Sequence, residues 1–165
     1  MPAFLAFREL ENAMLNMLGL PAERTANCAM FLSRGLLAAL FIHEGLSLAL
    51  HVTAALTAMG NLGVPAPLGI ASILLQLTAG LAILLGWQTR LAAASLGLFC
   101  VTTALLFHTH FAIRNDLLHF EKDLAIAGGM FALAIHGAGT WSLDHVRSKW
   151  RARSMCVRPD PVVPS

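Results

Sequence analysis

Residues 45–89 read GLSLALHVTAALTAMGNLGVPAPLGIASILLQLTAGLAILLGWQT and contain no Asp, Glu, Lys or Arg. One helical crossing of the hydrocarbon core of a bilayer takes about 20 residues. This run is therefore long enough for the end of one span, a turn and a complete second span. Two further runs without these charges cover residues 91–113 and 124–143. Together the three runs predict an integral membrane protein.

The composition supports a membrane protein and excludes several other classes. Of the residues, 57% are hydrophobic and 12% are charged, with a mean hydropathy of +0.70, whereas a soluble domain is about a quarter charged. The basic residues near the C-terminus are explained by topology and anionic lipid, so we expect no nucleic-acid partner. The three cysteines form no C-x-x-C pair, and we expect no metal site.

The charge-free runs predict an all-α fold, a bundle of four transmembrane helices. A loop (MGNLGVPAP, residues 59–67) and a short polar turn (WQTR, residues 87–90) separate the first three spans. The fourth span is short, so an alternative with three spans and one re-entrant segment stays open. The predicted spans cover residues 29–52, 68–86, 91–111 and 124–139.

Three segments follow from this division. Residues 1–28 have apolar positions at helical spacing, including Phe4, Phe7 and Met14. They predict an amphipathic interfacial helix or a short helix packed against the bundle. Residues 29–143 form the four-helix membrane domain, and residues 144–165 form a basic, Pro-containing cytoplasmic tail.

The distribution of Lys and Arg predicts the orientation. Four spans place both termini on one side of the membrane, and that side would carry eight basic residues against two on the other. Such a bias places the termini in the cytoplasm, so we expect a multi-pass protein of the inner membrane. The eight are Arg8, Arg24, Arg90, Arg147, Lys149, Arg151, Arg153 and Arg158, and the two are Arg114 and Lys122.

Polar side chains within the apolar runs are the candidate functional residues, because a charge inside a span costs about 2.5–3.5 kcal/mol and normally needs a partner. Most of them fall in the outer half of the predicted bundle. We hypothesise a polar pocket there, open to the periplasm or to the lipid interface, whose ionisable groups exchange protons with a quinone or bind a small polar ligand. The candidates are Arg34, His43, Glu44, Gln76, His110, Lys122 and Asp123.

Each candidate also has a structural interpretation. Gln76 is typical of the polar residues that hold membrane helices together. Arg34 lies about one turn from the cytoplasmic end, where its side chain can extend to the surface. For Glu44, Lys122 and Asp123, a functional role and a structural ion pair are equally compatible with the sequence.

Three stretches resemble the DoxX family of small membrane proteins. SRGLLAALFIHEGL (33–46) is similar to the first helix of the family, with Glu44 interrupting its His-Gly pair. LQLTAGLAILLGWQTRLAA (75–93) resembles the second helix and its Thr-Arg turn, with Gln76 where members often have Glu. FEKDLAIAGGMFALAIHGAGTWSLD (120–144) resembles the Lys-Asn-Leu-Ala…Gly-Gly…Ser-Leu-Asp segment, with Asp123 in place of Asn.

The resemblance covers about residues 30–144 and implies a four-helix fold with a link to redox metabolism. Relatives include the small subunit of a thiosulfate:quinone oxidoreductase and membrane partners of thiol-stress enzymes. Three functions stay open. The chain is a quinone-interacting membrane subunit of an oxidoreductase, a non-catalytic membrane anchor or scaffold for a soluble redox enzyme, or a small transporter, which would need to form a homo-oligomer.

Overall fold

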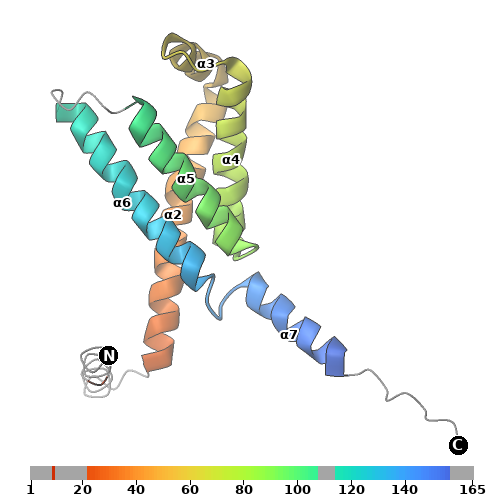
Figure 1. Cartoon of the computed structure of the whole chain (residues 1–165). Coiled ribbons are helices and arrows are strands. Elements are labelled where there is room, and N and C mark those ends of the chain that lie inside the picture. The colour runs from red at the N-terminus through yellow and green to blue at the C-terminus, as the bar shows by residue number, and fades with distance from the viewer. Residues whose placement is uncertain (1–8, 10–21, 108–113, 157–165) are drawn as a thin grey trace, which may run out of the picture.

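The computed structural model describes residue 9, residues 22–107 and residues 114–156, except for the side chains of residues 22, 23 and 152–156. Within these ranges the chain forms helices joined by short turns, which confirms the predicted all-α class. The helices are α2 (Ala22–Leu50), α3 (Val52–Asn61), α4 (Ala66–Leu85), α5 (Thr89–Phe107), α6 (Arg114–His136) and α7 (Leu143–Cys156), as Figure 1 shows. The predicted interfacial helix over residues 1–28 lies almost entirely outside the described residues.

The long apolar run contains one helix more than the sequence predicts. Helix α2 ends at Leu50, His51 adopts a non-helical backbone, and the short helix α3 follows directly. The predicted loop over residues 59–67 is therefore reduced to residues 62–65. Helix α4 then begins with Pro67 in its first turn, a position where the missing N–H of proline leaves no bond unmade.

The helices pack as two antiparallel pairs, α2 with α4 and α5 with α6, and the contact between α4 and α5 joins the pairs. Glycines bring the helices of each pair close together. A Cβ added at Gly80 would lie 3.0 Å from Cγ1 of Ile42, and one added at Gly97 would lie 2.9 Å from the ring of Phe131. Such small-residue contacts allow membrane helices to approach closely. Ile83, Leu96 and Met130 are fully buried between the pairs.

The outer surface of the bundle is apolar. Leucines at many helix positions are exposed, among them Leu36, Leu50 and Leu91, and a soluble monomer does not expose apolar surface on this scale. Three of the described helices are long and apolar enough to cross a membrane: α2 over Arg24–Leu50, α4 and α5. They correspond to the first three predicted spans.

The fourth predicted span, residues 124–139, lies within α6 and the turn that follows it. Helix α6 is not among the described helices that are both long enough and apolar enough to cross a membrane. The Asp, Glu, Lys and Arg residues of α6 all lie within its first ten residues. They are Arg114, Asp116, Glu121, Lys122 and Asp123.

The region after Ser142 is helical up to Cys156, a feature that the sequence interpretation of residues 144–165 as a polar tail did not include. Helix α7 leaves the bundle at the end where α6 finishes and extends away from the other helices (Figure 1). The last nine residues, 157–165, lie outside the described part of the chain.

Candidate functional site

A buried arginine joins α2 to the turn after α6. Arg34 is only 2% exposed. Its Nη1 donates to the carbonyl oxygen of Ala138 at 2.6 Å, and its Nη2 donates to that of Trp141 at 2.8 Å. Backbone carbonyls are common partners for charges buried in membrane proteins. The side chain of Arg34 is thus engaged within the protein and does not extend to the surface.

Aromatic rings cover the same guanidinium group. The Cζ atom of Arg34 lies 5.4 Å from the centroid of the Phe31 ring, within the range of a cation–π interaction. Phe31 in turn makes an edge contact with Trp141, with ring centroids 6.1 Å apart and planes at 65°. Two residues of α2 therefore hold the segment that connects α6 to α7.

Asp144 joins the start of α7 to the start of α5. Its Oδ1 accepts a hydrogen bond from the backbone N–H of Gln88 at 2.9 Å, and its Oδ2 accepts from that of Thr89 at 3.0 Å. The backbone N–H of Asp144 donates to the carbonyl oxygen of Gly86 at 2.9 Å. A carboxylate here satisfies N–H groups that have no partner in the helix and complements the positive end of the helix dipole.

Gly86 is the point at which these contacts converge. Its φ of 70° lies in the left-handed region that glycine adopts readily. A Cβ at this position would lie 2.5 Å from Cβ of Ser142 and 2.9 Å from Nη1 of Arg34. We call the assembly the Arg34 junction and define it as residues 34, 86–89 and 138–144.

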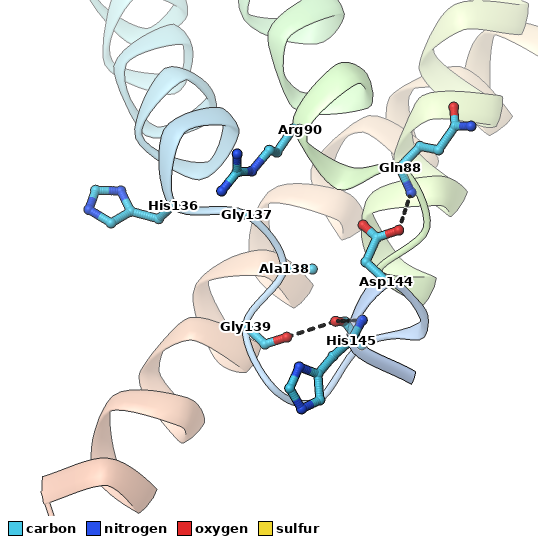
Figure 2. Close-up of a pocket in the computed structure, with 9 residues that line it drawn as sticks. Gln88, Arg90, His136, Gly137, Ala138, Gly139, Asp144 and His145 are labelled. Carbon is cyan, nitrogen blue, oxygen red and sulfur yellow. Dashed lines mark hydrogen bonds between the residues drawn. The ribbon is translucent and has the colours of Figure 1, made fainter. Parts of the chain in front are cut away.

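An open pocket of about 440 Å³ lies beside the Arg34 junction. The side chain of Arg90 lies over Gly137, with Nε 3.2 Å from the place a Cβ would occupy. Two histidines also line the pocket, and their rings point away from it in Figure 2. Among the described residues no group of His, Cys, Asp or Glu could hold a metal ion. The lining residues are Gln88, Arg90, His136, Gly137, Ala138, Gly139, Ser142, Asp144 and His145.

The candidate residues from the sequence occupy several places in the structure. Gln76 is buried where α4 meets α2, next to Gly45. Asp123 is half-buried and accepts a hydrogen bond from the hydroxyl of Thr103 on α5 at 3.3 Å. Arg34 bonds to residues beyond the end of α6, and Asp123 lies 13 residues, or about 20 Å, before that end. Arg34 and Asp123 thus lie towards opposite ends of the bundle, and Gln76 lies at the middle of α4.

Three further candidates are exposed, and one cannot be placed. His43 and Glu44 are exposed on α2, and Lys122 is exposed on α6 with its Nζ 3.4 Å from Nδ1 of His119. Glu44 forms no hydrogen bond or ion pair with the part of the chain that the structure describes. His110 lies outside the described residues.

Glu44 and Lys122 nevertheless occupy corresponding positions on facing helices. A Cβ added at Gly129 of α6 would lie 3.7 Å from the δ-carbons of Leu37 on α2. Glu44 follows Leu37 by seven residues, and Lys122 precedes Gly129 by seven. Seven residues advance a helix by about 10.5 Å and return to within about 20° of the same side. Both charges therefore lie about 10.5 Å along their helices from the contact of Leu37 with Gly129, towards the end where α6 begins.

Helices α2 and α6 diverge towards the end where α6 begins, and α5 runs between them in Figure 1. We call the diverging halves of α2 and α6 the α2–α6 region, which is marked by Glu44 and Lys122. His43, the neighbour of Glu44, lies about 100° further around α2.

Sequence reasoning missed the partners of the Arg34 junction. Asp144, Arg90 and the two pocket histidines were not among the candidates, although the Thr-Arg turn and the Ser-Leu-Asp segment were both part of the family resemblance. Those two segments and Arg34 meet in space. The occurrence of both segments in the family resemblance was the signal that could have identified them as parts of one site.

Comparison with known proteins agrees with this picture. A sequence model of the DoxX family matches residues 29–109. The chain is 35% identical to the inner membrane protein YqjF of Escherichia coli over 127 residues, which cover 77% of this chain and 98% of that protein. It is 32% identical to the inner membrane protein YphA of the same organism over 93 residues, 52% of this chain and 66% of that protein. No solved structure matches.

The relatives are named only as inner membrane proteins, which agrees with the exposed apolar helices. The match to YqjF is long and high in identity, and the family model matches the region of α2, α4 and α5. These two matches establish the family. This chain belongs to the DoxX family of integral membrane proteins.

Proposed function

We propose that the chain is a membrane subunit of a redox complex and that a quinone binds beside Glu44 and Lys122 in the α2–α6 region. The observation that supports this proposal is an exposed carboxylate, Glu44, within a candidate membrane span, with the exposed Lys122 on the neighbouring helix α6. A carboxylate in a span that faces neither a partner nor a polar ligand is costly. A polar head group beside Glu44 would supply a partner that the described residues do not provide.

The chemistry of a quinone fits this pair of charges. The Lys122 ammonium can donate to a quinone carbonyl oxygen, and the Glu44 carboxyl group can pass a proton to the second oxygen. Reduction to the quinol takes up two electrons and two protons, and the electrons would come from a partner oxidoreductase. The apolar tail of a quinone would extend into lipid along the exposed apolar surface of the helices.

The topology that goes with this function has four spans and both termini in the cytoplasm. Helix α6 would be the fourth span, packed along α5 through Gly97. Arg90, Arg147 and Lys149 belong to the end of the bundle that holds the Arg34 junction, which would then be the cytoplasmic end. Reporter fusions after Asn61 and after Cys156 test this orientation, since the first fusion should report the periplasm and the second the cytoplasm.

Quinone retention in mild detergent tests the binding proposal directly. The protein is purified and extracted, and quinone per protein is measured by mass spectrometry for wild type, Glu44→Gln and Lys122→Met. His43→Gln is the matched control, because it replaces the ionisable imidazole at the adjacent, exposed position with a neutral amide. We expect Glu44→Gln and Lys122→Met each to retain at least ten-fold less quinone than wild type, and the control to retain as much as wild type. Equal retention in all four proteins would contradict the proposal.

A second candidate function is that of a membrane anchor for a soluble redox enzyme. It is favoured by the open pocket beside Arg90 and by the basic helix α7, which lie at the same end of the bundle. The same purification distinguishes the two functions. A stoichiometric soluble partner without quinone supports the anchor, and its loss on Arg90→Gln would place the contact at the pocket.

A further inference from the structure

Helix α7 has an apolar stripe that the bundle does not cover. Leu143, Val146 and Trp150 are 50%, 51% and 73% exposed. At 100° per residue these three positions lie within about 60° of one another around the helix. A stripe of this kind is typical of helices that lie in a membrane surface.

Basic residues lie along both edges of this stripe. On a helical projection Arg147 and Arg151 fall about 40° and 80° beyond Leu143 on one side, and Lys149 falls about 60° beyond Val146 on the other. All three are exposed. Asp144 is the only acidic residue in the sequence of α7, and its carboxylate is bound to the start of α5. The exposed part of α7 is therefore positive and apolar.

The first turn of α7 is fixed to the first turn of a candidate membrane span. Trp141, which precedes it, is half-exposed and its carbonyl oxygen accepts from Arg34. Tryptophan is enriched at membrane–water interfaces. Asp144 fastens the first turn of α7 to the first turn of α5, which is a candidate membrane span. Figure 1 shows α7 displaced from α6 by the turn and directed obliquely away from the bundle.

We propose that α7 lies on the membrane surface with the stripe of Leu143, Val146 and Trp150 in the lipid and binds anionic phospholipid through Arg147, Lys149 and Arg151. The occupant is the lipid surface itself, because the stripe begins at the membrane boundary and its flanking charges complement phosphate head groups. The helix then serves as an interfacial support next to the pocket beside the Arg34 junction. This inference stands independently of quinone binding.

Fluorescence of Trp150 in the full chain tests the proposal. Trp87→Phe and Trp141→Phe leave Trp150 as the single tryptophan, and the protein is placed in nanodiscs of phosphatidylcholine with or without phosphatidylglycerol. Brominated acyl chains quench a tryptophan that lies in lipid, whereas acrylamide quenches one that lies in water. We expect bromolipid quenching in both lipids, at least two-fold stronger with phosphatidylglycerol.

Charge reversal separates lipid binding from simple proximity. Arg147→Glu, Lys149→Glu and Arg151→Glu together should remove the dependence on phosphatidylglycerol, whereas the control Arg114→Glu, on α6, should keep it. Equal quenching in the two lipids would overturn the electrostatic part of the proposal. Strong acrylamide quenching in both lipids would overturn the whole. Protection of Trp150 from acrylamide only on addition of a soluble partner would show that α7 binds protein instead of lipid.

Discussion

Replacement of Gly86 by alanine should weaken the Arg34 junction by an amount that the structure allows us to estimate. At its φ of 70°, a residue with a Cβ loses about 1–2 kcal/mol relative to glycine. The added methyl group would also lie 2.5 Å from Cβ of Ser142 and 2.9 Å from Nη1 of Arg34. Overpacking of this kind costs about 1–3 kcal/mol. We therefore expect Gly86→Ala to lower the free energy of unfolding by about 2–5 kcal/mol.

Two other glycines provide controls that separate the two contributions. Gly63 has a φ of 83° with no atom within 4 Å of an added Cβ, so Gly63→Ala should lose only the backbone part, about 1–2 kcal/mol. Gly128 is helical and also has no atom within 4 Å of an added Cβ. Gly128→Ala should raise the free energy of unfolding by about 0.5–1 kcal/mol, because alanine loses less conformational freedom than glycine when a helix forms.

Unfolding of the purified protein in mixed micelles, followed by circular dichroism as the fraction of dodecyl sulfate is raised, measures all three variants. The expected order of stability is Gly128→Ala, wild type, Gly63→Ala and then Gly86→Ala. The reasoning would be refuted if Gly86→Ala and Gly63→Ala were equally stable, because no close contact would then exist between Gly86 and Ser142.

Further predictions concern the charged residues at both ends of the bundle. Arg34→Lys keeps the charge but not the two-pronged geometry, so we expect a loss of about 1–3 kcal/mol in the same unfolding assay, and no change would contradict the two carbonyl contacts. Asp144→Asn leaves only one acceptor oxygen for two N–H groups and should cost about 1–2 kcal/mol. It should also speed amide hydrogen exchange at the start of α5, and unchanged exchange there would refute the cap. Glu44→Lys combined with Lys122→Glu should retain as little quinone as Glu44→Gln or Lys122→Met, because the donor and the carboxyl group exchange places. Normal quinone retention in this double variant would contradict the roles proposed for the two side chains.

The sequence predicts the membrane helices well because one physical quantity determines them. A span must contain about 20 residues without charge. Helix α4 (Ala66–Leu85) ends close to the end of the first charge-free run, and α5 (Thr89–Phe107) begins close to the start of the second. The start of α4 follows the predicted loop with Gly and Pro. The break at His51 was not predicted, because neither glycine nor proline marks it. Helix α3 was therefore divided between the end of the first span and the loop.

The partners of the candidate residues were not predictable in the same way. Arg34 bonds to the carbonyl oxygens of Ala138 and Trp141, and Asp144 bonds to the N–H groups of Gln88 and Thr89. Every residue has a carbonyl group and nearly every residue an N–H, so these acceptors and donors leave no trace in the sequence. A sequence suggests only complementary side chains as partners for a charge, whereas the partners of Arg34 and Asp144 are backbone groups.

This difference in partners separates structural charges from available ones. The charges of Arg34 and Asp144 are used by backbone groups and fasten α2, α5 and α7 at one end of the bundle. Their removal is thus expected to affect stability first. At the other end Glu44 and Lys122 lie on helices that diverge, and Glu44 is exposed within a candidate span. Among the described residues Glu44 has no ion-pair partner, and a ligand gains most beside a costly charge of this kind. The chemistry that we propose therefore belongs to the α2–α6 region, and the Arg34 junction fixes the helices that carry it.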